Sequence, residues 1–217
     1  MTVKRDTPVA HHVGFVARDA EKMARAYERL LDAKFDLLDP LPVHNLYDEQ
    51  ATIRVAYGAF ANLVVEIIEP MDGHLPHHDF LDKYGEGIQH IGFQVDDPAA
   101  WTGRLAEAGA RIEWIVDDTN HLSIGYLTPD STSEEMVRRV TPDCLSYLDA
   151  GIGNVAIEFM GPQIQGRMLN RWDGPLGETK TTIPTDPSRG GVPSEHPLIG
   201  ELITTTPPNW FTGERRG

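Results

Sequence analysis

A short pattern recurs in the two halves of this 217-residue chain and constrains the fold more than any other feature. Segment 12–16, His-Val-Gly-Phe-Val, matches segment 90–94, His-Ile-Gly-Phe-Gln, and segment 62–70 matches segment 154–162. Each half therefore opens with a histidine-bearing apolar segment and closes with a glutamate-bearing one. Such a repeat predicts two similar modules that bring equivalent residues to one place.

Each repeated segment reads as a β-strand in which a histidine or a glutamate stands among apolar residues. Strand alternation puts His12 on one face of its strand, and Glu66 and Glu158 lie in the middle of apolar strands. A carboxylate there is costly unless it is paired, protonated or bound to a metal. His12, Glu66, His90 and Glu158 are a suitable ligand set for one Zn, Ni, Co, Mn or Fe ion, with two positions left for substrate oxygens. The alternative is that these four residues are polar groups on the sheet surface.

Hydrophobic periodicity predicts the same order of elements in both halves. After the first strand, Asp19 is a suitable cap for a helix over 20–33, and Asp97 followed by Pro98 marks a second helix. Strands are expected at 10–17, 35–38, 52–57, 63–68, 88–95, 111–116, 122–127 and 154–160. The predicted fold is α+β: two tandem βαβββ modules (9–71 and 88–162) form a curved, partly open sheet around a metal site. Residues 72–87 are the expected linker, about 131–147 a helical insertion, and 163–217 an extended, irregular Pro/Gly-rich tail.

Composition narrows the functional class. The net charge of −14 argues against nucleic acid and against anionic membrane surfaces, because both require clustered Lys and Arg. The single cysteine, Cys144, cannot form an internal disulfide, which fits a reducing compartment. The chain has no apolar run of membrane-spanning length and no signal-peptide pattern at its start. We therefore expect a cytoplasmic protein that acts on a small molecule.

Paired βαβββ units with His, Glu, His and Glu on their first and last strands resemble the vicinal oxygen chelate superfamily. Within this superfamily, the run 80–97, which contains His90, is similar to the corresponding stretch of the methylmalonyl-CoA epimerases. The resemblance as a whole covers about residues 9–162. It implies a divalent metal held by the four residues named above, and a homodimer. It also implies two carboxylates facing each other across the substrate, Glu158 and, in a Glu-Gln pair ahead of a strand, Glu49.

The leading hypothesis is a metal-dependent epimerase or isomerase that abstracts a proton next to a carbonyl. Glu158 and Glu49 would move the proton, and His44 and His121, near predicted strand ends, are possible substrate contacts. Glu66 is more similar to the residue of glyoxalase I than to the glutamine frequent in epimerases, so a lactoylglutathione lyase is an alternative. An extradiol dioxygenase and a non-catalytic small-molecule-binding protein are further alternatives.

Overall fold

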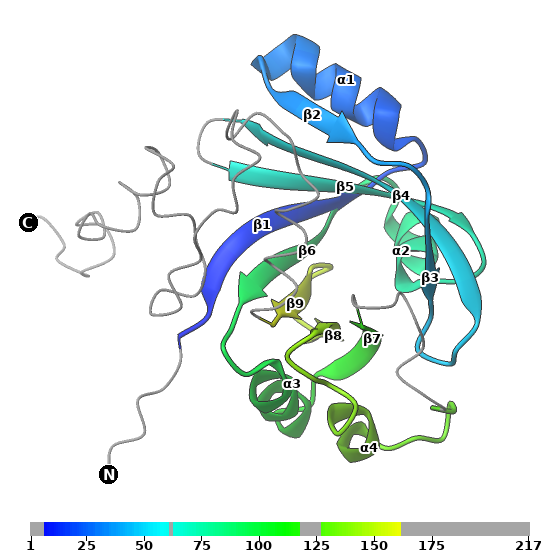
Figure 1. The fold of residues 1–217 in the computed structure, drawn as a ribbon, viewed down its shortest axis with the longest axis vertical. Coiled ribbons are helices and arrows are strands. Elements are labelled where there is room, and N and C mark those ends of the chain that lie inside the picture. Colours follow the sequence, from blue (N-terminus) through cyan, green and yellow to red (C-terminus); the bar gives the residue numbers. More distant parts are fainter. Residues whose placement is uncertain (1–6, 61–62, 118–126, 162–217) are drawn as a thin grey trace, which may run out of the picture.

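The computed structural model describes residues 7–60, 63–117 and 127–161, in which both halves of the chain build one sheet (Figure 1). The first half contains β1 (Val9–Val16), α1 (Ala20–Leu31), β2 (Lys34–Leu37), β3 (Leu41–His44), β4 (Gln50–Phe60) and β5 (Leu63–Asp72). After α2 (Pro76–Tyr84), the second half contains β6 (Gly87–Gln94), α3 (Pro98–Glu107), β7 (Arg111–Asp117), α4 (Ser133–Val137), β8 (Cys144–Asp149) and β9 (Ala156–Met160).

The sheet joins the two modules through their first strands. Its order is β2-β4-β5-β1-β6-β9-β8-β7, with β3 paired to β4. Within each module the first strand is parallel to the last, β1 to β5 and β6 to β9, and β1 and β6 run antiparallel to each other. The sheet curves strongly, as the ribbon shows (Figure 1). The expected α+β fold of two βαβββ modules is confirmed.

The long helices begin where the sequence predicts and cover one face of the sheet. The Asp19 side chain accepts a hydrogen bond from the amide of Lys22, and Asp97 does the same for Ala100, so both are N-caps. Helix α1 packs on residues of β4 and β5, and α3 packs on β8 and β9. Among the described residues, the structure has no helix with the length and apolarity needed to cross a membrane.

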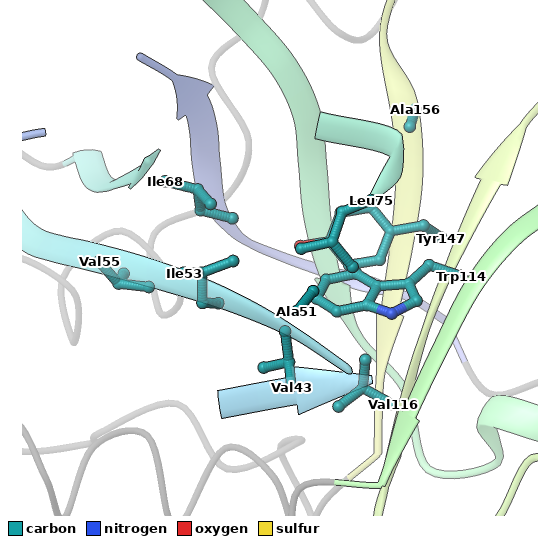
Figure 2. Close-up of a cluster of buried hydrophobic side chains, with 10 residues drawn as sticks. All are labelled: Val43, Ala51, Ile53, Val55, Ile68, Leu75, Trp114, Val116, Tyr147 and Ala156. Carbon is teal, nitrogen blue, oxygen red and sulfur yellow. The ribbon is translucent and has the colours of Figure 1, made fainter. Parts of the chain in front are cut away.

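The opposite, concave face is lined by apolar side chains from both modules. Strand alternation turns these residues inward, and Figure 2 shows them around a shared interior. Trp114 from β7 ties the modules together, because its indole N–H donates to the backbone oxygen of His44 at 2.7 Å. The cluster consists of Val43, Ala51, Ile53, Val55, Ile68, Leu75, Trp114, Val116, Tyr147 and Ala156.

Two regions differ from the sequence-based expectation. The helix expected within 131–147 is confined to Ser133–Val137, and residues 144–147 belong to strand β8. Both faces of β8 are buried, so its sequence lacks the polar–apolar alternation that reveals a half-exposed strand. The linker also forms a helix, α2, with Pro76 in its first turn. The strand expected at 122–127 falls almost entirely within 118–126, outside the described residues, as does the tail at 163–217.

Candidate metal centre

Four strands bring the four predicted ligands to one place inside the sheet. His12 lies on β1, Glu66 on β5, His90 on β6 and Glu158 on β9, which are four adjacent strands. The four residues are 0–4% exposed. All come from one chain, so the two modules complete this cluster without a partner subunit. Its position follows from the β1–β6 pairing, which places the two histidine-bearing strands side by side.

The spacing of the donor atoms matches what a shared cation requires. His12 Nε2 lies 3.0 Å from His90 Nε2, 3.0 Å from Glu158 Oε2 and 3.4 Å from Glu66 Oε2. His90 Nε2 lies 3.0 Å from Glu66 Oε2 and 3.6 Å from Glu158 Oε2. Two donors about 2.1 Å from one ion are about 3.0 Å apart at a right angle and about 3.4 Å apart at a tetrahedral angle. The buried group of His12, Glu66 and His90 is thus compatible with a metal site, and Glu158 Oε2 lies 3.0 Å from His12 Nε2 beside it.

An unsatisfied oxygen supports the same conclusion. Glu158 Oε2 has no hydrogen-bond partner among the described residues, although it lies 3.0 Å from His12 Nε2. A buried carboxylate oxygen without a partner is energetically costly. Two imidazole nitrogens that face each other at 3.0 Å also need a proton or a cation between them. A divalent ion satisfies all of these groups together.

Glycines make room for the two imidazole rings. In the β1–β6 pairing His12 lies opposite Gly92, and His90 lies opposite Gly14. A Cβ atom at Gly14 would overlap the His90 ring, and one at Gly92 would overlap the His12 ring and crowd Glu158. The repeated His-x-Gly motif therefore has a steric reason, because each module supplies a histidine and the space for the other module's histidine.

A tyrosine accompanies each glutamate in the neighbouring strand. Tyr57 of β4 is in register with Glu66, and Tyr147 of β8 is in register with Glu158. The Tyr57 hydroxyl donates a hydrogen bond to Glu66 Oε1. The Tyr147 hydroxyl lies 3.5 Å from His90 Nε2, and its ring packs edge-on against the His90 ring. The repeated unit thus contains a tyrosine that the sequence comparison of the two halves missed.

The outer ring nitrogens of both histidines have partners that orient the rings. Gln89 Oε1 lies 2.7 Å from His90 Nδ1 and can only accept, so it fixes the tautomer in which Nε2 is free to bind a cation. His11 Nδ1 lies 2.9 Å from His12 Nδ1. In both cases Nε2 is the atom that faces the carboxylates, which is the orientation that a metal site needs.

The metal-free cluster is held together by a proton. Burial by itself lowers the pKa of His12, but the carboxylates of Glu158 and Glu66 raise it to about 10. Burial by itself raises the pKa of Glu66, whereas its contacts with His12 and His90 hold that pKa well below the ordinary value. The favoured state near neutral pH is a protonated His12 beside the ionised Glu66 carboxylate. A cation bound here would take the place of this proton.

Helix α2 adds a histidine to the interior. His77 is fully buried, and its ring packs edge-on against Trp114 and Tyr147, with ring centroids 5.1 and 5.6 Å away. Neither ring nitrogen has a hydrogen-bond partner within the described part of the chain. Burial, with a smaller contribution from His90, lowers the pKa of His77 to about 3, so the ring is neutral. The sequence favoured no chemical role for this residue, since it lies in the predicted linker.

The other predicted site residues lie outside the buried cluster. Glu49 is exposed ahead of β4, and its carboxylate accepts a hydrogen bond from the Asn45 side chain at 2.7 Å. His44 ends β3 and is partly buried, and its backbone oxygen binds Trp114. His121 lies outside the described residues. The structure therefore brings together the four predicted metal ligands but adds neither Glu49 nor His44 to them.

Comparison with known proteins is consistent with this architecture. The ethylmalonyl-CoA/methylmalonyl-CoA epimerase of Cereibacter sphaeroides is 31% identical over 103 residues, 47% of this chain and 72% of that protein. The uncharacterized protein YqjC of Bacillus subtilis is 23% identical over 133 residues, 60% of this chain and 90% of that protein. The crystal structure of methylmalonyl-CoA epimerase from Mycobacterium tuberculosis is 21% identical, with a TM-score of 0.43, over 74% of this chain and 91% of that chain.

The family assignment rests on a match to more than half of the chain. Residues 11–126 match the family described as Glyoxalase/Bleomycin resistance protein/Dioxygenase superfamily. The match includes His12, Glu66 and His90, three of the four clustered residues. The chain belongs to the glyoxalase/bleomycin resistance protein/dioxygenase superfamily.

Proposed function

We propose that this protein is a divalent-metal-dependent epimerase or isomerase that abstracts a proton next to a substrate carbonyl. The observation that carries the proposal is the convergence of His12, Glu66, His90 and Glu158 in one buried cluster with the spacing of metal ligands. The likeness to a relative named ethylmalonyl-CoA/methylmalonyl-CoA epimerase supports it.

These four residues would hold the cation. Two imidazole nitrogens and two carboxylate oxygens suit Zn, Ni, Co, Mn or Fe, and they leave positions for two substrate oxygens. When bound, such an ion polarises a carbonyl oxygen as a Lewis acid and so makes the neighbouring C–H more acidic. The apolar residues of the concave face exclude water from this region.

Glu158 is the proposed base. The Tyr57 hydroxyl holds Glu66 Oε1, and Glu66 Oε2 lies 3.4 Å from His12 Nε2 and 3.0 Å from His90 Nε2, so Glu66 is committed to the cluster. Glu158 Oε2 has no hydrogen-bond partner among the described residues. In the proposed reaction one oxygen of Glu158 would bind the cation and the other would take the proton. A carboxylate placed next to a polarised carbonyl is a suitable general base for this reaction.

The second carboxylate of an epimerase would return the proton on the opposite face of the substrate. Glu49 stays our prediction for this role. It stands just ahead of β4, two residues before Ala51 of the concave cluster. Its present hydrogen bond is to Asn45, which it would have to give up to act.

Solvent exchange tests the proposed reaction directly. The metal-loaded protein is incubated in deuterated water with ethylmalonyl-CoA, methylmalonyl-CoA and a set of 2-keto compounds, and deuterium in the recovered material is measured by mass spectrometry. We expect incorporation next to the carbonyl, and its loss in Glu158→Gln. Absence of deuterium from every compound, with metal present in the protein, would contradict the proposal for these substrate classes.

One observation favours a second function. A glutamate at position 66 resembles glyoxalase I more than the epimerases, and here it lies within the cluster. Turnover of the methylglyoxal–glutathione adduct separates a lactoylglutathione lyase from an epimerase, because only the former yields lactoylglutathione. A cytoplasmic location and a homodimeric state both stay predictions.

A further inference from the structure

The least satisfied buried group near the cluster is His77, and its neighbours have no polar atom to offer it. The indole N–H of Trp114 already donates to His44, and the Tyr147 hydroxyl already lies at His90 Nε2. Leu75, which precedes α2, is fully buried in the same apolar cluster and stands beside Tyr147 and Trp114 in Figure 2. Both nitrogens of His77 are thus left without a partner among the described residues.

Such an arrangement is unfavourable for the folded protein alone. A buried imidazole without hydrogen bonds has lost the hydration of its nitrogens and gained only ring contacts in return, which an apolar residue at this position could also make. Groups held at a cost to stability concentrate at binding sites, where a ligand satisfies them. A structural role for His77 would instead require a protein partner, which the described part of the chain does not supply.

The position of His77 indicates what kind of ligand would satisfy its ring nitrogens. Its ring contacts Tyr147, whose ring contacts His90 at a centroid distance of 4.9 Å, so one aromatic ring touches both His77 and a residue of the cluster. Both lie on the concave face. We infer that His77 is a substrate-binding residue that hydrogen-bonds an oxygen of the substrate beyond the two oxygens that bind at the cluster.

The surroundings also limit the chemistry of that oxygen. A neutral imidazole among Leu75, Trp114 and Tyr147 offers one donor and one acceptor but no charge, so it matches an uncharged hydroxyl or carbonyl. A carboxylate at this point would be desolvated without a counter-ion. The substrate class is therefore a small acyl compound with an uncharged oxygen next to its chelating group. This inference rests on the proposed function, because it assumes chelation at the cluster.

Two hydroxamates of nearly equal shape test it. Glycolohydroxamate carries a hydroxyl where propionohydroxamate carries a methyl group, and both chelate through the same two oxygens. Their affinities for the zinc-loaded full-length protein are measured by calorimetry. Because one added hydrogen bond is worth on the order of tenfold in affinity, we expect the wild type to prefer glycolohydroxamate by about that factor.

Variants connect this preference to His77. His77→Leu should bind propionohydroxamate as the wild type does and bind glycolohydroxamate no better. His74→Gln is the matched control: it changes an exposed histidine of the same segment and should keep the wild-type preference. Equal binding of the two compounds by the wild type, or a preference that survives in His77→Leu, would overturn the inference while leaving chelation intact. If neither compound bound the zinc-loaded wild type, the proposed chelation would fail and this inference with it.

Two further readouts separate ligand binding from a structural role. Leucine removes unsatisfied nitrogens, so His77→Leu should unfold at the same or a higher temperature than the wild type. A markedly lower unfolding temperature would mean that the ring has a structural partner, which overturns the inference. In the unmodified protein, the ¹⁵N resonances of the His77 ring should shift with glycolohydroxamate and stay in place with propionohydroxamate. The reverse pattern, or no shift with either, would also contradict it.

Discussion

The first and second modules supply the same set of residues to the cluster but hold their glutamates differently. Each contributes a histidine, a glycine that faces the other histidine, a tyrosine and a glutamate. Glu66 is fixed by Tyr57 and His90, whereas Glu158 keeps an oxygen without a hydrogen bond among the described residues. Duplication therefore explains the symmetry of the cluster, and the difference between the two carboxylates supports our proposal that Glu158 of the second module moves the proton.

The largest expected effect comes from replacing the two glutamates of the cluster one at a time. Glu158→Gln should lower the rate of solvent exchange on the order of 10²–10⁴-fold, the usual contribution of a general base, whereas Glu66→Gln should lower it about tenfold or less. Deuterium incorporation at saturating metal is the measurement, and the metal content of each variant is the control. Equal losses in the two variants would mean that the modules are functionally equivalent.

The pH dependence of the metal-free protein tests the proton that holds both modules together. His12 has a pKa raised from 6.5 to about 10, so its stabilising effect is complete below about pH 6.5 and is lost as the pH rises toward 10. The free energy of unfolding of the metal-free protein should therefore fall over this window, by an amount on the order of a few kcal/mol. Thermal unfolding at a series of pH values measures it. Metal-loaded protein lacks that proton and should show no such fall. The same slope in both forms would contradict the exchange of a proton for a cation.

Substitution of Gly14 and Gly92 tests whether each module must leave space for the histidine ring of the other. Gly14→Ala and Gly92→Ala should each destabilise the protein by about 1–3 kcal/mol, the usual cost of overpacking, and reduce its metal content. Gly103→Ala is the control, because a Cβ on α3 would meet Val137 at an ordinary 3.4 Å. Calorimetric unfolding and elemental analysis measure both effects. A harmless Gly14→Ala would mean that the His90 ring does not lie over Gly14 as described.

Replacement of Tyr57 or Tyr147 by phenylalanine should have the smallest effect, a loss of metal affinity. Tyr57→Phe removes the hydrogen bond to Glu66 and should weaken metal binding about tenfold, as is usual for groups that orient ligands. Tyr147→Phe should cost less, since its hydroxyl lies 3.5 Å from His90 Nε2. Tyr27→Phe on α1, outside the cluster, is the control. Competition with a coloured chelator gives the affinities, and a larger loss in Tyr147→Phe would reverse the assignment of roles.

The sequence was sufficient for the modules and the four clustered residues because these depend on local patterns that recur. Strand alternation fixes the face on which Glu66 lies, and Asp19 and Asp97 mark helix starts by local hydrogen bonds. Tyr57 and Tyr147 also recur, but at different distances from their glutamates, so a comparison in fixed register overlooks them. The two tyrosines lie in the strands next to the repeated segments, so the pairing of neighbouring strands reveals that they are equivalent.

Other features depend on tertiary contacts and leave little local trace. Strand β8 is covered on both sides, so the sequence of Cys144–Asp149 shows no polar face. His77 lies two residues after Leu75 in a segment that reads as a linker, and its burial arises only because α2 packs against the concave face. His77 stands three and four residues before Phe80 and Leu81, which are also buried. This helical spacing is the local signal that separates it from the exposed His74.

Metal stoichiometry tests the central claim most directly. Metal-free protein is titrated with cobalt(II), and binding is followed by calorimetry and by the visible spectrum of the bound ion. The account predicts one ion per chain with nitrogen and oxygen ligands, and loss of this site in His12→Ala and His90→Ala. A protein that stays empty at excess cobalt, zinc, nickel, manganese and iron would contradict it and favour a metal-free binding role for this fold.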